Sequence, residues 1–87
     1  MNKKKLLKFS AAWCSPCKQL SEALLKLADD KFPYEITEID IQKDPGITEF
    51  WGVKGIPTLI VVDSNMQEVK RKTGYINVNK LKEFLNE

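Results

Sequence analysis

The segment Phe9-Ser-Ala-Ala-Trp-Cys-Ser-Pro-Cys-Lys18 runs from an apolar stretch into two cysteines, Cys14 and Cys17, that are separated by two residues. They are the only cysteines among 87 residues, and their close spacing indicates local redox chemistry rather than a disulfide-rich scaffold. Pro16 suits the first turn of a helix, where a missing N–H costs nothing. The segment therefore predicts a strand that ends before Cys14 and a helix that begins at the cysteine pair.

This placement gives the two cysteines different chemical roles. A thiol attacks a disulfide as its thiolate, and the positive end of a helix dipole favours that form. We therefore predict that Cys14 attacks a target disulfide to form a mixed disulfide, and that Cys17, one turn inside the helix, attacks this intermediate and releases the reduced target. Three other interpretations of the pair stay open: a structural disulfide, half of a metal site shared by two chains, and an inert pair in a binding module.

The composition excludes several other kinds of catalytic and binding site. Because the chain has no histidine, it can build neither a Cys–His nor a Ser–His–Asp catalytic set. Two cysteines are too few for a structural zinc site, so we expect no metal, and neither phosphate-cradling glycine pattern occurs. The formal net charge of +2 gives no reason to expect a nucleic-acid partner, and we interpret the short basic clusters 3–5 and 70–72 as solvated faces or protected strand edges.

The length and composition predict one compact domain over residues 1–87. Of these residues 43% are hydrophobic and 30% are charged, which fits a folded domain and leaves no room for a second one of ordinary size. No apolar run approaches the ~20 residues of a membrane-spanning helix, and Lys8 interrupts the short apolar run after the N-terminal lysines. We therefore expect a cytoplasmic protein without a membrane partner, whose mature chain begins at Met1.

Runs of β-branched residues and period-two alternation predict four strands. They are expected over residues 5–10, 34–41, 58–62 and 66–73. A turn at Asp63-Ser-Asn65 makes the last two strands a hairpin. The first two strands are joined through a helix and should be parallel, so the hairpin makes the sheet a mixed one.

Apolar residues at helical spacing predict three helices. The first follows the cysteine pair and turns five residues inward: Leu20, Ala23, Leu24, Leu27 and Ala28. A short second helix is expected to begin at Asp44-Pro45, with Asp44 as its N-cap, and to end at Gly52. Asn77 is expected to cap the last helix, whose inward residues are Val78, Leu81, Phe84 and Leu85. The predicted order is β-α-β-α-β-β-α, an α/β fold with a mixed four-stranded sheet flanked by helices on both faces.

Several segments resemble the thioredoxin family. Trp13-Cys-Ser-Pro-Cys-Lys18 resembles its active site, which typically reads Trp-Cys-Gly-Pro-Cys-Lys. Asp44-Pro-Gly46 followed by Gly52-Val-Lys-Gly-Ile-Pro-Thr58 is similar to the family's approach to its cis-proline loop, and Gly74 and Leu81-Lys-Glu-Phe-Leu85 resemble its final turn and helix. The resemblance covers nearly the whole chain. It implies a thioredoxin-like fold reduced to a minimal core, without the first strand and helix of common thioredoxins.

The resemblance also implies roles for residues around the cysteines. Ile56–Pro57 would be a cis peptide bond against the cysteine pair, and the backbone before the proline would pair with a bound substrate segment. Trp13 and Ile56 would form the walls of a shallow docking groove, while Gly55 and Gly74 would let a substrate backbone approach closely. The remaining support would come from Pro16 and Lys18 of the motif and from Ser15, which stands in place of the family's glycine and could hydrogen-bond a sulfur.

Two charged residues depart from the family pattern. Common thioredoxins carry a buried aspartate in the strand before the motif and a lysine on the next strand, and here Lys8 and Glu38 occupy those two positions. We hypothesise that they form an ion pair, in which Glu38 accepts the proton of Cys17 directly or through water and Lys8 favours the thiolate. The alternative is that Lys8 extends into solvent at a strand edge and does not affect the cysteines.

By this resemblance the protein would be a thiol–disulfide oxidoreductase, a protein-disulfide reductase that carries electrons and maintains the redox balance of the cell. It would act as a monomer without a cofactor of its own, receive electrons from thioredoxin reductase and pass them to enzymes such as ribonucleotide reductase. The alternatives are a glutaredoxin-like reductase that depends on glutathione, an oxidant or isomerase, and a non-catalytic interaction module with the same fold. Cysteine-to-serine changes separate the last alternative, because a module would keep its function without thiols.

Overall fold

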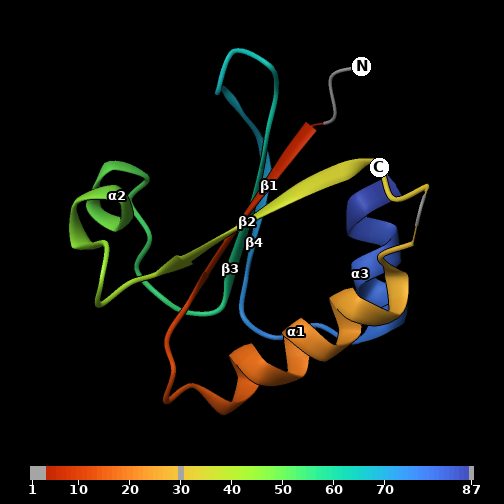
Figure 1. Ribbon diagram of the computed structural model, residues 1–87, viewed down its shortest axis with the longest axis horizontal. Coiled ribbons are helices and arrows are strands. Elements are labelled where there is room, and N and C mark those ends of the chain that lie inside the picture. Colours follow the sequence, from red (N-terminus) through yellow and green to blue (C-terminus); the bar gives the residue numbers. More distant parts are fainter. Residues whose placement is uncertain (1–3, 30, 87) are drawn as a thin grey trace.

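The computed structural model of the protein describes residues 4–29 and 31–86. Within them, strands and helices follow in the order β1 (Lys4–Ser10), α1 (Ser15–Leu27), β2 (Tyr34–Asp40), α2 (Pro45–Phe50), β3 (Thr58–Val62), β4 (Glu68–Thr73) and α3 (Val78–Asn86). This order and the α/β architecture confirm the prediction from the sequence (Figure 1). Residues 1–3, where we expect the mature chain to begin, lie outside the described residues. None of the helices in the described ranges combines the length and apolar character needed to cross a membrane.

The strands form one mixed sheet in the order β2-β1-β3-β4. β1 pairs with β2 in parallel and with β3 in antiparallel orientation, and β4 runs antiparallel to β3 at one edge. The parallel pairing of β1 with β2 confirms what a connection through a helix predicts. β1 is therefore held on both sides, and its carboxyl end carries the cysteine segment.

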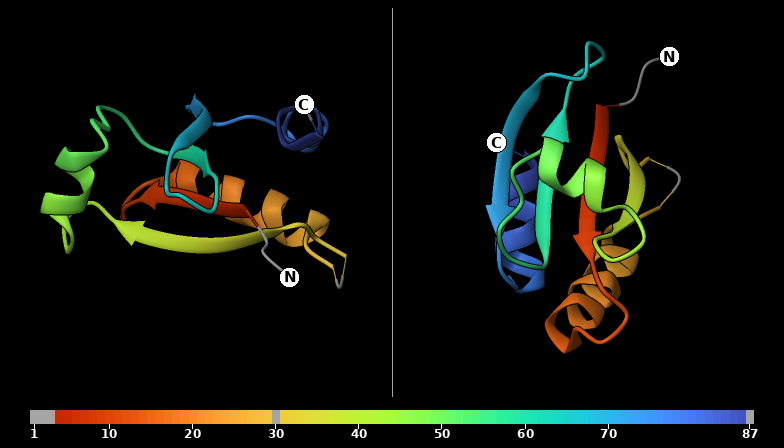
Figure 2. Two further views of the ribbon diagram at one scale, coloured as in Figure 1. Left: turned by 90° about the horizontal axis from the view of Figure 1, so that it is seen from above. Right: turned by 90° about the vertical axis from the view of Figure 1, so that its left-hand side faces the viewer.

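Two apolar clusters lie on opposite faces of this sheet. Alternation along β3 places Leu59 and Val61 in the cluster beneath α1 and α3, and Ile60 and Val62 in the cluster on the side of α2. α1 and α3 cover one face, and the six-residue α2 lies on the other side (Figure 2). Because β3 is covered on both faces, all five of its residues are buried, which explains why its sequence does not alternate between apolar and polar residues.

Most predicted element ends hold, and three details were wrong. β4 begins at Glu68 rather than Met66, because Met66 has a positive φ of 61° and belongs to the turn. Ala28 follows the end of α1 and is exposed, so it does not belong to the inward stripe. Asp44 precedes α2 as predicted but its side chain makes no capping bond.

Asn77 does cap α3, since its Oδ1 accepts a 2.9 Å hydrogen bond from the N–H of Lys80.

Tyr34 connects α3 to the sheet. Its hydroxyl donates a 2.5 Å hydrogen bond to the backbone carbonyl of Leu85, which lies in the last turn of α3 where carbonyls lack partners within the helix. The ring packs against Phe32 with a centroid distance of 5.6 Å. Burial raises the pKa of Tyr34 above its ordinary value of 10.0. The phenol is therefore held in its neutral, hydrogen-bonded form.

We predict that Tyr34→Phe lowers the free energy of unfolding by about 1 kcal/mol at neutral pH, because it removes this hydrogen bond. Since the pKa is raised in the folded state, the contribution of the neutral phenol is fully present below pH 10.0 and is lost as the pH rises through the folded-state pKa. The difference from the native protein should therefore narrow in strongly alkaline buffer. Urea unfolding of the native protein and the variant, at neutral pH and in strongly alkaline buffer, measures this difference in the free energy of unfolding. Tyr75→Phe, a change at an exposed tyrosine, is the control. A difference that stays constant would contradict this account.

Candidate active site

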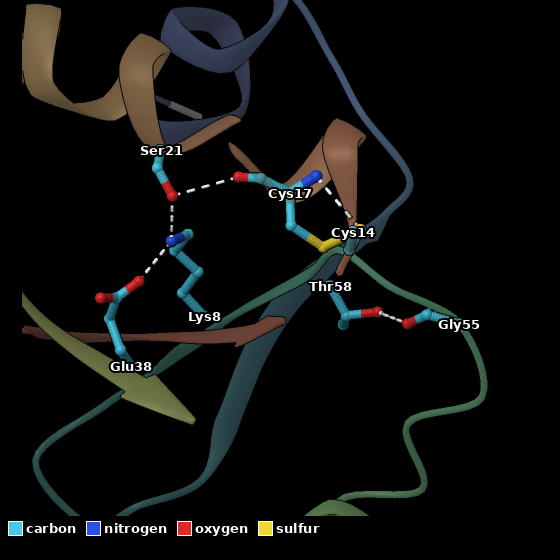
Figure 3. Close-up of a disulfide and its surroundings, with 7 residues drawn as sticks. All are labelled: Lys8, Cys14, Cys17, Ser21, Glu38, Gly55 and Thr58. Atoms are coloured by element: carbon cyan, nitrogen blue, oxygen red, sulfur yellow. Dashed lines mark hydrogen bonds and ion pairs between the residues drawn. A yellow bond between two sulfur atoms is a disulfide. The ribbon is translucent and has the colours of Figure 1, made fainter. Parts of the chain in front are cut away.

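The cysteine pair lies where β1 gives way to α1 (Figure 3). Cys14 is the N-cap residue of α1, with an extended backbone of φ −93° and ψ 105°. Its Sγ accepts a 3.2 Å hydrogen bond from the backbone N–H of Cys17. The two residues form a disulfide with their Cα atoms 5.2 Å apart. The prediction that both sulfur atoms meet at the start of the helix is confirmed.

The two cysteines are buried against apolar residues, whereas the other residues of the motif are exposed to solvent. Cys14 and Cys17 are 5% and 2% exposed and pack with Ala11, Ile41 and Ile56. The other motif residues Trp13, Ser15, Pro16 and Lys18 are all exposed. Trp13 is 63% exposed, so its side chain is not part of the core. The disulfide thus lies just beneath a surface formed by the residues of its own motif.

The loop before β3 borders the same cluster. Its Ile56–Pro57 peptide bond is cis, and Ile56 packs against the cysteines. The Thr58 hydroxyl donates a 2.6 Å hydrogen bond to the carbonyl of Gly55 (Figure 3). The Pro57 carbonyl accepts a 2.7 Å bond from the N–H of Gly74. These bonds connect the proline loop to β3 and to the end of β4.

Gly55 and Gly74 lie next to the proline loop, and the backbone requires glycine at only one of these two positions. Gly74 has a φ of +96°, which side-chain-bearing residues rarely adopt, so the backbone itself calls for glycine. At Gly55 an added Cβ would lie 3.5 Å from the Thr73 side chain, an ordinary contact. Packing within the described residues therefore does not demand glycine at position 55.

Lys8 lies beneath the helix turn that carries Cys17. It is 3% exposed, and its Nζ contacts both the Glu38 carboxylate and the Ser21 hydroxyl (Figure 3). The hydroxyl of Ser21 donates a 3.1 Å hydrogen bond to the carbonyl of Cys17. The expected contact between Lys8 and Glu38 is confirmed, and the alternative in which Lys8 extends into solvent is wrong.

Ser21 is a residue that the sequence analysis missed. The available signal was its spacing, because a residue four positions after Cys17 lies on the same side of α1. A polar cavity of about 350 Å³ opens at this place, and Lys8, Cys17, Ser21, Glu38, Asp40 and Lys43 are among its lining residues. The structure thus brings a buried ammonium, a hydroxyl and a carboxylate to the back of the disulfide.

Comparison with known proteins gives a consistent result. The family model described as Thioredoxin matches residues 1–87. The thioredoxin of Mycoplasmoides gallisepticum is 34% identical over 84 residues, an alignment that covers 97% of this chain and 83% of that protein. The thioredoxin of Chlamydia muridarum is 43% identical over 70 residues, covering 79% of this chain and 67% of that protein.

Solved structures agree with the sequence comparison. A mutant thioredoxin from Halobacterium salinarum superposes with a TM-score of 0.85 at 27% identity, covering 98% of this chain and 74% of that one. The germline-specific thioredoxin Deadhead from Drosophila melanogaster gives a TM-score of 0.85 at 27% identity, with 97% and 79% covered. Nearly the full length of this chain, including the cysteine pair, α1 and the sheet, therefore has the same fold as these two thioredoxins.

Proposed function

The chain belongs to the thioredoxin family, and from this premise we propose that it reduces the disulfides of other proteins through Cys14 and Cys17. The observation that carries the proposal is the disulfide itself, which is formed at a helix N-terminus beside the proline loop. A disulfide that closes so short a loop contributes little stability, so a structural role does not account for it. As one domain over residues 1–87, the protein would cycle between this disulfide and a dithiol.

The reaction proceeds in two exchanges. In the reduced protein the Cys14 thiolate attacks a sulfur of the target disulfide, and the other target sulfur leaves as a thiolate. Cys17 then loses its proton and attacks Cys14, which breaks the mixed disulfide and releases the second target thiolate. The target gains two electrons and the protein ends as the Cys14–Cys17 disulfide. The Cys17 N–H that bonds the Cys14 sulfur, together with the helix dipole, favours negative charge on the attacking atom.

The target would dock at the proline loop. Within residues 4–29 and 31–86, no hydrogen bond engages the peptide groups of Ile56, which leaves them for an extended target segment that pairs like an added strand. Ile56 and the exposed Trp13 would contact apolar side chains of that segment. Close approach of its backbone would explain Gly55, where packing alone does not require glycine. Gly74 would border the same groove.

Lys8 acts as a positioning residue behind this reaction. Its ammonium favours the thiolate state of the cysteines, and through Ser21 it orients the helix turn that holds Cys17. Glu38 neutralises part of the lysine charge and lines the same cavity as Cys17. In our proposal Glu38 accepts the Cys17 proton through water in that cavity, because the Lys8 ammonium stands between the carboxylate and the helix turn (Figure 3).

The family suggests the partners of the reaction. Thioredoxin reductase would return electrons to the Cys14–Cys17 disulfide, and proteins such as ribonucleotide reductase would receive them. The protein would act in the cytoplasm as a monomeric electron carrier that maintains the redox balance of the cell. It would need no cofactor of its own, because sulfur chemistry alone completes both exchanges.

We predict that the reduced protein cleaves insulin disulfides in the presence of NADPH and thioredoxin reductase. Cys14→Ser should abolish the reaction, because it removes the attacking sulfur. Cys17→Ser should stop it at the mixed disulfide, which mass spectrometry detects as a covalent adduct on Cys14. Turnover with glutathione and glutathione reductase but not with thioredoxin reductase would instead support the glutaredoxin-like alternative. Failure of the native protein to reduce insulin, together with partner binding that both serine variants keep, would support a non-catalytic module.

A further prediction concerns the ion pair between the buried Lys8 and the exposed Glu38. Lys8→Met should move the alkylation profile of reduced Cys14 to higher pH and slow alkylation roughly threefold to tenfold at neutral pH, because the favourable charge is lost. Glu38→Gln should move the profile to lower pH, since the lysine charge is then unopposed. Lys5→Met is the matched control, because Lys5 pairs with Glu35 between the same two strands at 3.8 Å and is exposed. Identical profiles for all variants would leave Lys8 and Glu38 without a redox role.

A further inference from the structure

The helix that precedes the proline loop is only loosely packed. α2 (Pro45–Phe50) has no buried residue. From its end the chain runs through residues 51–57 directly into β3 (Figure 1). No hydrogen bond among the described residues engages the N–H groups of residues 54–56. The position of the proline loop therefore depends in part on how the end of α2 is attached to the sheet.

Arg71 on β4 makes this attachment. Its guanidinium donates a 2.8 Å hydrogen bond to the backbone carbonyl of Trp51, the C-cap residue of α2. Carbonyls at the end of a helix lack partners within the helix, so this bond satisfies a group that α2 itself leaves open. The Trp51 side chain also packs against the apolar cluster on the α2 side of the sheet. A side chain of the edge strand thus holds the end of a helix 20 residues earlier in the chain.

A β-bulge in β4 brings a carboxylate to the same face as Arg71. Arg71 pairs with Ile60 across the ladder. Glu68 pairs with Val62, and both of these β3 residues belong to the cluster on the α2 side. Residues three apart in a regular strand point to opposite faces. Because the register shifts between Val61 and Val62, β4 holds one extra residue, and Glu68 comes to lie on the face of Arg71.

Glu68 fixes the orientation of the guanidinium. Nε and Nη2 of Arg71 donate hydrogen bonds of 2.9 and 2.6 Å to the two carboxylate oxygens, and a paired contact of this kind defines the plane of the group. These bonds hold the pKa of Glu68 below its ordinary value of 4.5, so the carboxylate is ionised at neutral pH. The two side chains are 32% and 36% exposed, and a pair at such a surface contributes little to global stability. What the pair does is aim the guanidinium at Trp51.

We propose that Arg71 is a positioning residue for target docking, which holds the end of α2 so that Ile56 presents its peptide groups to an extended target segment. The proposal rests on the proposed reductase function. Trp51 and Ile56 pack against the same apolar cluster, so a shift at one end of the segment is felt at the other. The described hydrogen bonds of Arg71 go to Glu68 and Trp51 and not to the cysteine pair.

These contacts determine what the loss of Arg71 should change. Without the guanidinium the Trp51 carbonyl has no partner, and the segment after α2 gains other positions. Only a fraction of the molecules then presents the loop in the docking geometry, and the apparent affinity for a target falls by that fraction. The sulfur exchange itself is unaffected. The defect should therefore appear with a target that docks at the loop and be absent with a disulfide too small to do so.

The experiment uses protein reduced beforehand with dithiothreitol and measures second-order rate constants for two disulfides. One is a neutral peptide with extended residues on both sides of its disulfide, and the other is hydroxyethyl disulfide. Arg71→Met should slow reduction of the peptide roughly threefold to tenfold and leave the rate with hydroxyethyl disulfide unchanged. Amide hydrogen exchange of residues 52–56 should become faster in the same variant. The control is Lys80→Met, which removes one positive charge from another ion pair of the same spacing, Lys80–Glu83, and should change neither rate.

A double-mutant cycle tests the role of Glu68. Glu68→Gln should slow the peptide reaction by less than Arg71→Met does, because the amide still accepts a hydrogen bond but carries no charge. The double variant should be no slower than Arg71→Met alone, because Glu68 acts through Arg71. Additive slowing would contradict this order of action. Glu68→Gln also keeps the proposal testable if Arg71→Met does not fold.

The outcomes separate the positioning role from the reductase function. If Arg71→Met slows both disulfides equally, or neither, the positioning role is overturned and the reductase function stands. The same loss in Lys80→Met would show an effect of net charge and would also overturn the positioning role. If the native protein reduces neither disulfide, the reductase function fails, and the positioning role fails with it.

Discussion

The change from strand to helix at Cys14 is the feature on which the rest of the site depends. β1 is paired on both sides, with β2 and β3, and its residues Leu6 and Phe9 are fully buried. The end of β1 is therefore fixed in space. α1 begins shortly after it, and Pro16 favours this start because its ring fixes a helical φ and the missing N–H would have no partner in the first turn. In that turn the N–H of Cys17 donates a hydrogen bond to the Cys14 sulfur. The way β1 ends thus places the Cys14 sulfur at the N-terminus of α1, where the helix dipole favours a thiolate.

The buried lysine belongs to the same construction. An ammonium that is 3% exposed is costly unless it has partners, and here a carboxylate and a hydroxyl contact it. Lys8 and Glu38 are neighbours in the parallel ladder, as are Lys5 and Glu35 three residues earlier. Only the pair at the carboxyl end of the strands lies beneath α1, where Ser21 connects it to Cys17. The two lysine–glutamate pairs therefore differ in their surroundings, because α1 covers only the pair of Lys8 and Glu38.

Local patterns in the sequence predicted what depends on local chemistry. The cap by Asn77 and the helix at the cysteine pair follow from residue types and spacing. The contact of Lys8 with Glu38 was expected from the resemblance to the family together with the parallel pairing of their strands. The start of β4 was misplaced because Met66 adopts a left-handed turn that its side chain does not signal. The hydrogen bond from Tyr34 to Leu85 could not be predicted, because it joins residues 51 positions apart that no short motif connects.

In the proposed function the Cys14–Cys17 pair is poised as a reductant, and Glu38 balances the charge of Lys8. The most direct test is the reduction potential of the pair, obtained by equilibration with dithiothreitol and glutathione buffers and quantification of the dithiol. We predict a value near about −270 mV, typical of reducing thioredoxins. A value between about −180 and −120 mV, typical of isomerases and oxidants, would contradict the account.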